Sequence, residues 1–377
     1  MPQATGMDMA MSLGQEMETA DNNPSGFNYL RLLLALAVIT WHTVIVCYGL
    51  EAETPFWTGP IRPAIFFILP AFFALGGFLV AASALRNTIA GFLLLRAMRL
   101  YPALLFEVTT FAIIIGPFIT TYSLGAYFTD ESLYLYLLNA TGFIHYFLPG
   151  VFGSNPAGPA VNLQLWTIPR ELECYALLTG LALIGFTRRP ALIALALAVM
   201  SAYGLMRDQQ ALIGSGPPAR LLILSFLAGI LLYMWKDKVP SRFPYFVLAA
   251  ALSWYCLSDV HLMSLSPLPV AYATVWLGAK NPRRIWFVAT GDYSYGLYLY
   301  GYPTQQLIAQ LLPDLRIWYW NGIISVIVAG VFACISWHLV EHPVLKRKSQ
   351  ILALLRVHAP GRRTRAMISL AGRPEPA

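Results

Sequence analysis

Ten apolar segments, separated by polar and basic stretches, constrain the fold of this chain more than any other feature. Each approaches or reaches the roughly 17 to 25 residues needed to cross a bilayer. Hydrophobic residues make up 58% of the 377 residues, charged residues only 11%, and mean hydropathy is +0.60, so a soluble fold would lack polar surface. We predict an all-α integral membrane protein of about ten transmembrane helices, with cores near 28–49, 61–84, 101–123, 166–186, 190–206, 219–235, 243–259, 262–279, 291–312 and 318–340.

The sequence outside these segments divides the chain into three parts. Residues 1–26 carry Asp and Glu but no Lys or Arg, which is the wrong charge for the start of a secretory signal, and we expect a disordered cytoplasmic tail. Residues 27–345 hold the spans and an extracytoplasmic loop at about 124–165. The apolar stretch 134–148 in that loop is too short to cross, so we expect an interfacial or re-entrant helix. Residues 346–377 form a basic cytoplasmic tail that suits anionic membrane lipids.

The distribution of basic residues predicts how the chain is oriented. With the N-terminus in the cytoplasm, nineteen Lys and Arg residues lie on the inner side and five lie at or near the outer side, as the positive-inside rule requires. An even number of spans then returns the C-terminus to the cytoplasm. We expect a multi-pass protein of the inner (plasma) membrane. The net charge of +7 then indicates topology and not binding to nucleic acid.

Arg31 and His42 are costly polar side chains inside the first apolar segment. Eleven residues separate them, close to three helical turns, so both lie on one face about 16.5 Å apart along the helix axis. They cannot contact each other, and polar side chains at membrane depth normally face a bundle interior or a wet cavity. Each is either a structural hydrogen-bonding group or a functional one. Their common face favours function.

Arg96 and Arg99 lie three residues apart near the expected cytoplasmic start of the third span, and therefore on one helix face. One interpretation is that they anchor the helix as positive-inside residues. The other is that the two guanidinium groups together bind a phosphate polyanion, which a single anchor does less well. The spacing alone is compatible with both.

Glu171 and Glu173 begin the fourth span, and only one of them is expected to face the bundle because they point roughly 200° apart. Glu173 can pair with Arg170 at i, i+3, while Glu171 shares a face with Tyr175 at i, i+4. Glu171 lies about as deep as His42. A carboxylate beside an imidazole would select its tautomer and make it a stronger base, so we expect these two to meet. A structural ion pair of Glu171 with Arg170 is the alternative.

Six short motifs follow one another along the membrane region. In this order they resemble the acyltransferase-3 family of bacterial integral membrane O-acyltransferases, over roughly residues 27–345. Gly76 and Gly301 depart from the family pattern, which has Ser and often His there, and neither supplies a side-chain hydrogen bond. The motifs are Arg31 with His42 (R-x10-H), FFALGGFLV at 72–80, Arg96 and Arg99 with Tyr101 and Pro102, Trp166 with Ile168 and Glu171, GDYSYGLYLYGYP at 291–303, and Trp337 with Val340, Glu341 and Pro343.

The resemblance implies transfer of an acyl group, expected to be acetyl, from acyl-CoA to a sugar hydroxyl of a surface or secreted glycan or glycolipid, with no metal. His42 would act as general base or, alternatively, carry the acyl group itself. Acetyl-CoA would enter from the cytoplasm. The implied site residues are Arg31, His42 and Glu171 for catalysis, Arg96 and Arg99 with Arg31 for the CoA phosphates, and Trp166, Tyr175, Ser294 and Tyr295 for the substrate.

Other functions are open at this stage. A secondary transporter also has about ten spans and intramembrane His, Arg and Glu, but it would show inverted repeats, and the second half of the chain has no counterpart of R-x10-H. A non-catalytic subunit would not need to retain the five charged and imidazole residues together. Acylation of a non-glycan small molecule is a further alternative, because none of these residues identifies the acceptor.

Overall fold

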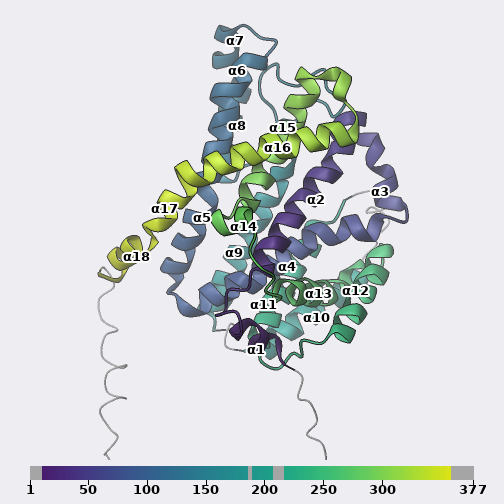
Figure 1. Ribbon diagram of the computed structural model, residues 1–377, viewed down its shortest axis with the longest axis vertical. Coiled ribbons are helices and arrows are strands. Elements are labelled where there is room, and N and C mark those ends of the chain that lie inside the picture. Colours follow the sequence, from purple (N-terminus) through teal and green to yellow (C-terminus); the bar gives the residue numbers. More distant parts are fainter. Residues whose placement is uncertain (1–10, 186–188, 207–215, 358–377) are drawn as a thin grey trace, which may run out of the picture.

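The computed structural model describes residues 11–185, 189–206 and 216–357, and these residues form helices and turns with no β-strand among them (Figure 1). The predicted all-α architecture is confirmed for this part of the chain. A helix lies in each segment that the sequence predicts as a span. The helices are α2 (Gly26–Tyr48), α4 (Arg62–Arg86), α5 (Ile89–Thr109), α9 (Thr167–Leu183), α10 (Pro190–Met206), α11 (Ala219–Met234), α12 (Phe243–Ser258), α13 (Pro267–Gly278), α15 (Ser294–Leu311) and α16 (Trp318–Ser336).

Ten membrane crossings stay a prediction, because only some of these helices reach the length that a bilayer requires. α10, α11 and α12 are apolar but have only 16 or 17 residues. α13 has 12 residues and begins at Pro267, a residue type that suits the first turn of a helix. The helices of the described chain that are long and apolar enough to cross are Gly26–Tyr48, Arg62–Arg86, Ile89–Ile119 and Trp318–Ala353.

The third long helix begins earlier than the sequence predicts. We expected its core to begin near residue 101, but α5 begins at Ile89, where the side chain of Thr88 accepts a hydrogen bond from the backbone N–H of Gly91. Arg96 and Arg99 therefore lie inside α5 and not at its cytoplasmic start. This position lets both side chains line the helix bundle.

Two π-helical segments extend the long helices. α5 continues through η2 (Thr110–Ile115) into α6 (Gly116–Ile119), and α16 continues through η9 (Trp337–Glu341) into α17 (His342–Lys346). A π turn is wider than an α turn and occurs frequently at functional sites. The η9 turn holds the buried Glu341 side chain against α5.

α4 and α11 pack closely because glycines line their contact. A Cβ atom on Gly77 would lie 2.0 Å from the carbonyl oxygen of Phe226, and one on Gly229 would lie 2.0 Å from that of Ala74. No side chain fits either space, so the two backbones approach as small residues allow in membrane proteins. This pair of helices supplies part of the wall of the cavity described below.

The start of the chain corrects the expected disordered tail at 1–26. Within it, α1 (Leu13–Glu18) begins with a capping box. Glu16 of α1 forms an ion pair of 2.5 Å with Lys280. A local cap and a tertiary ion pair therefore order this segment, and neither is evident from its charge alone. Residues 1–10 lie outside the described part of the chain.

The loop at 124–165 is built from short helices. The helix expected at 134–148 ends early, because Gly142 has a φ of 94° and the side chain of Asn139 bonds to the backbone N–H and C=O of His145, each at 2.7 Å. The short helices of the loop are α7 (Leu124–Thr129), α8 (Glu131–Leu137), η3 (Leu138–Thr141) and η4 (Leu163–Trp166).

Short helices also connect the long helices elsewhere in the chain. They are η1 (Leu50–Glu53), α3 (Thr54–Thr58), η7 (Met263–Leu265), α14 (Trp286–Thr290) and η8 (Pro313–Leu315).

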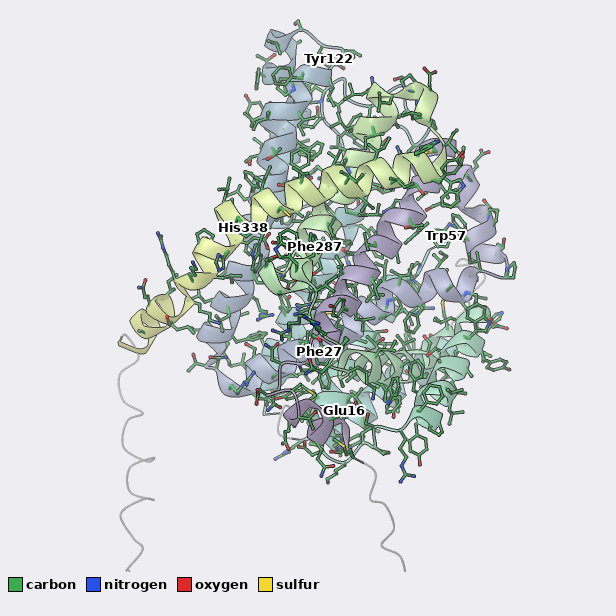
Figure 2. All side chains as sticks on the ribbon, viewed as in Figure 1. Glu16, Phe27, Trp57, Tyr122, Phe287 and His338 are labelled. Atoms are coloured by element: carbon green, nitrogen blue, oxygen red, sulfur yellow. The ribbon has the colours of Figure 1, made fainter. Side chains whose placement is uncertain are left out.

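The loop and the start of the chain lie at opposite ends of the molecule. Figure 1 shows α1 at the lower end and α7 at the upper end, and Figure 2 marks the same two ends by Glu16 and Tyr122. Part of the predicted basic tail 346–377 forms α18 (Lys348–Val357), and the residues after 357 lie outside the described chain.

Candidate active site

A cavity lies between α2, α4, α5, α9 and α15 and gathers most of the residues that the sequence singles out. Segments far apart in the sequence meet here, as is usual for sites between the helices of a bundle. Only His42 and Trp166, among the site residues predicted from the sequence, do not line it. Trp166 instead packs against the main hydrophobic core. The polar side chains of the wall are Arg31, Arg96, Arg99, Thr167, Glu171, Tyr175, Ser294, Tyr295 and Tyr298.

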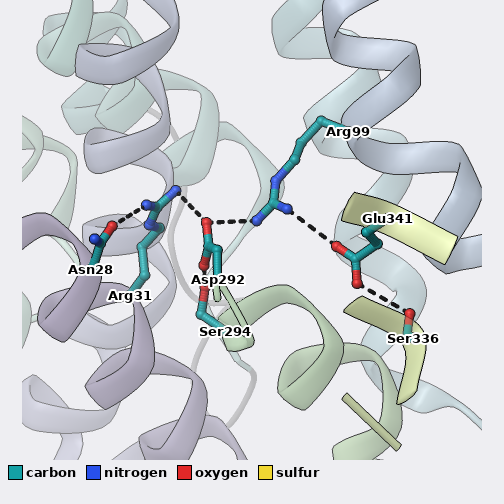
Figure 3. A network of polar contacts seen from close by, with 7 residues as sticks. All are labelled: Asn28, Arg31, Arg99, Asp292, Ser294, Ser336 and Glu341. Carbon is teal, nitrogen blue, oxygen red and sulfur yellow. Dashed lines mark hydrogen bonds and ion pairs between the residues drawn. The ribbon is translucent and has the colours of Figure 1, made fainter. Parts of the chain in front are cut away.

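A chain of ion pairs crosses this site and joins α2, α5 and η9 (Figure 3). Asp292 accepts from Arg31 at 3.1 Å and from Arg99 at 2.8 Å, both through Oδ2. Arg99 also pairs with Glu341 at 3.1 Å. One carboxylate thus binds two guanidinium groups, which fixes their relative position. The outer contacts of the chain are Arg31 to Asn28 at 2.7 Å, Ser294 to Asp292 at 2.7 Å and Ser336 to Glu341 at 3.1 Å.

Asp292 stays ionised because of its neighbours. It lies in the turn between α14 and α15, outside the long helices. Burial by itself would raise the pKa of this carboxyl, but the charges of Arg99 and Arg31, with hydrogen bonds from Ser294, outweigh burial and hold the pKa at about 2. The carboxylate therefore neutralises part of the positive charge in the cavity at every physiological pH.

Arg96 differs from the other two arginines of the cavity. Among the described residues no carboxylate forms an ion pair with it, and its Nε atom is buried without a hydrogen-bond partner. It lines the cavity beside Tyr175 and also faces a second hollow between α5 and α9. Its charge is consequently the one most available to an anion, since Arg31 and Arg99 are already paired with Asp292.

The local pairs predicted for α9 are confirmed. The hydroxyl of Tyr175 donates to Glu171, and Arg170 pairs with Glu173 at 2.6 Å. Glu171 lines the cavity, whereas 43% of the Glu173 side chain is exposed, which answers which carboxylate faces the bundle. Because these pairs depend only on helical spacing, the sequence was sufficient to predict them.

His42 lies away from the wall of this cavity, in an aromatic environment. Its ring stacks on Trp41 with centroids 4.9 Å apart and meets the edge of Tyr302 at 5.2 Å. The expected contact with Glu171 is not formed: no hydrogen bond joins the two among the described residues, and the carboxylate is bonded to Tyr175. The prediction of a contact between His42 and Glu171 was wrong because equal depth in two helices does not determine how each helix is rotated about its axis.

Two carboxylates of the site, Asp292 and Glu341, were not predicted from the sequence. Both occur inside motifs that carried the family resemblance, GDYSYG at 291–296 and the W-x-x-V-E stretch at 337–341. The signal was therefore present, but nothing local indicates that these acids bind Arg31 and Arg99. That pairing links residues about two hundred positions apart or more in the sequence.

Sequence comparison with known proteins identifies the family of this chain. The sequence profile of an acyltransferase domain matches residues 25–339. The O-acetyl transferase of Shigella phage Sf6 is 25% identical over 353 residues, covering 87% of this chain and 98% of the relative. Nodulation protein 10 of Rhizobium leguminosarum bv. viciae is 23% identical over 372 residues, covering 90% and 98%. No solved structure matches significantly. Because the profile spans nearly all the described helices, the chain belongs to the acyltransferase-3 family.

Proposed function

We propose that this protein transfers an acyl group, in the first place acetyl, from acyl-CoA to a hydroxyl of a sugar in a surface or secreted glycan or glycolipid. Family membership supports acyl transfer, and the relative named O-acetyl transferase supports acetyl as the group. The observation that carries the proposal is the gathering of Arg31, Arg96 and Arg99 in one cavity with Glu171. Three guanidinium groups around one space favour a ligand with several negative charges.

The phosphates of CoA fit the charge of this cavity. Arg96 has no carboxylate partner among the described residues, so a phosphate can bind it without displacing an ion pair. Arg31 and Arg99 are held by Asp292 and can add hydrogen bonds from a fixed position. We assign Glu171 and Tyr175 to the wall that surrounds the donor, because they bond to each other there.

His42 is the proposed general base. Its imidazole takes the proton of the acceptor hydroxyl while that oxygen attacks the thioester carbonyl carbon. A C–O bond forms, the C–S bond breaks, and the CoA thiolate leaves and recovers the proton from the imidazolium. If His42 instead carried the acyl group, the protein would release about one thiol per molecule from acetyl-CoA without any acceptor.

We further propose that acetyl-CoA enters from the cytoplasm and the acceptor from the outer side of the inner (plasma) membrane. About ten crossings with both termini in the cytoplasm would give this arrangement. The excess of Lys and Arg on one side and the location of α1 and α7 at opposite ends of the molecule support it.

The test is an assay of the purified full-length protein in detergent with acetyl-CoA and glycan fractions extracted from the host cell surface. We expect free thiol and O-acetylated glycan to appear together. Thiol release that requires a small non-glycan alcohol would change the acceptor class. Solute uptake by reconstituted vesicles without any thiol release would replace the proposal with a transporter.

A further inference from the structure

A cluster of aromatic and polar side chains surrounds His42, outside the cavity with the arginines. Trp41 stacks on the imidazole, and Tyr302 meets its edge. Trp57 of α3, which is labelled in Figure 2, packs its ring perpendicular to Trp41 with centroids 5.1 Å apart. Glu53, at the end of η1, lies beside the indole groups of Trp41 and Trp57 and close to Tyr302.

Two polar atoms in this cluster are buried and have no partner. They are Nδ1 of His42 and the hydroxyl oxygen of Tyr302. The residues that carry them are 6% and 1% exposed. Buried polar groups in proteins are almost always hydrogen-bonded. Two such groups on rings that contact each other, with the indole N–H of Trp41 bonded to the carboxyl of Glu53 beside them, therefore indicate the place of a ligand.

The unpaired atoms also indicate the chemical class of that ligand. The hydroxyl of Tyr302 can donate or accept, and a neutral imidazole nitrogen does one or the other according to the tautomer. An ammonium group suits an aromatic cluster but can only donate. A hydroxyl group both donates and accepts, so a ligand with several hydroxyl groups satisfies the whole set. The half-buried carboxyl of Glu53 adds a strong acceptor for one of those hydroxyls.

We propose that this cluster is the acceptor-binding site and that Glu53 binds one sugar hydroxyl while a second hydroxyl faces His42. The inference depends on the transfer reaction proposed above and names its acceptor end. Glu53 holds the sugar, and His42 takes the proton of the reacting hydroxyl as that oxygen attacks the thioester carbon. The Trp41 and Tyr302 side chains, which contact the imidazole, bind the remaining polar groups of the ring.

The surroundings of Glu53 agree with this role. Burial raises the pKa of its carboxyl to about 7, and hydrogen bonds from the indole groups of Trp41 and Trp57 only partly oppose that rise. A carboxyl that is poorly solvated gains most when a ligand supplies hydrogen bonds to it. Glu51, two residues earlier in η1, is exposed and is therefore a matched control.

The first experiment measures binding without a donor. Saturation-transfer NMR of methyl glycosides of glucose, galactose, mannose and N-acetylglucosamine is recorded with the full-length protein in detergent. We expect saturation transfer to at least one glycoside, a loss of affinity of tenfold or more in Glu53→Gln, partial recovery in Glu53→Asp, and wild-type behaviour in Glu51→Gln. Absence of binding to the wild type, or equal binding to Glu53→Gln, would overturn the inference.

The second experiment separates the two substrates kinetically. With the glycoside that binds best, Glu53→Gln should raise the KM for the glycoside at least tenfold and leave the KM for acetyl-CoA within about twofold. A merely structural role would change both constants and lower the melting temperature. If the binding pattern holds but no thiol is released by the wild type, the acceptor site stands and the proposed transfer reaction fails. If transfer occurs and Glu53→Gln has no effect on either constant, transfer stands and the acceptor site fails.

Discussion

At the scale of single residues, the three arginines of the cavity are not equivalent. Arg31 and Arg99 share Asp292, and Arg99 also pairs with Glu341. Arg96 forms no ion pair among the described residues. Arg96 bonds to Tyr175 and lies near the carboxyl of Glu171. Because it is in no ion pair, its guanidinium group has more interaction left for a ligand than that of Arg31 or Arg99.

This difference predicts that substitution of Arg96 changes donor binding, whereas substitution of Arg99 changes stability. Arg96→Ala should raise the KM for acetyl-CoA by about 10- to 100-fold, since a hydrogen bond to a charged group is worth roughly 1.5 to 3 kcal/mol, and it should leave the melting temperature unchanged. Arg99→Ala should lower the melting temperature because the buried Glu341 loses its arginine and Asp292 keeps only Arg31. Steady-state kinetics and thermal melts in detergent measure both effects. Equal loss of stability in the two variants would contradict the distinction.

His42 supports a second prediction at this scale. His42→Ala should remain folded and inserted in the membrane but should lose transfer by about 10²- to 10⁴-fold, the usual effect of removing a general base. His261, which is exposed, provides the control His261→Ala with wild-type activity. Substantial transfer by His42→Ala would remove the base from the mechanism.

At the scale of helices, close packing at glycines shapes the cavity. The contact of α4 with α11 depends on Gly77 and Gly229, whose missing side chains leave no room for a Cβ atom. Gly76, next to Gly77, lies instead on the cavity wall, where a Cβ atom would be 4.0 Å from Phe226. Neighbouring glycines in one motif therefore serve different purposes.

The two glycines give a matched pair of variants. Gly77→Ala should destabilise the protein by about 1 to 3 kcal/mol, because the clash with the Phe226 carbonyl outweighs the roughly 1 kcal/mol that Ala gains over Gly in a helix. Gly76→Ala should keep or raise the stability. Thermal melts of the two purified variants decide the matter, and a stable Gly77→Ala protein would show that the helices can move apart without cost.

Asp292 acts at the same scale, because it joins α2 and α5 to the turn before α15. Its pKa in the folded protein is about 2, below the ordinary value of 3.8, so its contribution to stability is present above about pH 4 and is lost as the pH falls towards 2. Asp292→Asn should cost about 3 kcal/mol at pH 7, since it leaves the partly buried Arg31 without an ion pair and Arg99 with Glu341 alone.

The pH dependence provides the check on this substitution. The difference in melting temperature between wild type and Asp292→Asn should be constant between about pH 5 and pH 8 and should shrink only below about pH 4. A difference that already disappears near pH 6 would mean that Asp292 is not held in its ionised form by the two arginines.

At the scale of the whole molecule, orientation decides where each substrate enters. α1 and α7 lie at opposite ends (Figure 1), so one end faces the cytoplasm if the chain crosses as proposed. Glu18 on α1 and Gly125 on α7 are both exposed, and a Cβ atom on Gly125 would meet no other atom within 4 Å. Either position therefore accepts a cysteine.

Labelling of intact cells with a membrane-impermeant maleimide tests the orientation. Gly125→Cys should react on intact cells, and Glu18→Cys should react only after the membrane is permeabilised. The native cysteines of the described chain are buried or partly buried, so a cell line with the unchanged protein gives the background. Reversed labelling would invert the orientation and place the donor on the wrong side.

The sequence by itself determined the features that depend on neighbours along one helix. Apolar length located the long helices, and i, i+3 and i, i+4 spacing predicted the pairs of Arg170 with Glu173 and of Glu171 with Tyr175. The motifs of the family also singled out the three arginines that meet in the cavity. Such features require no knowledge of how one helix is rotated against another.

Only the tertiary structure decided which distant groups meet. Asp292 binds Arg31 and Arg99, and His42 contacts Trp41 and Tyr302 while Glu171 lines the cavity with the arginines. Depth along a helix follows from the count of residues, but the rotation of each helix follows from packing, such as the glycine contact of α4 with α11. The sequence therefore identified most polar residues of the site but not Asp292 and Glu341. Packing placed these residues in a cavity with the arginines or in a separate cluster around His42.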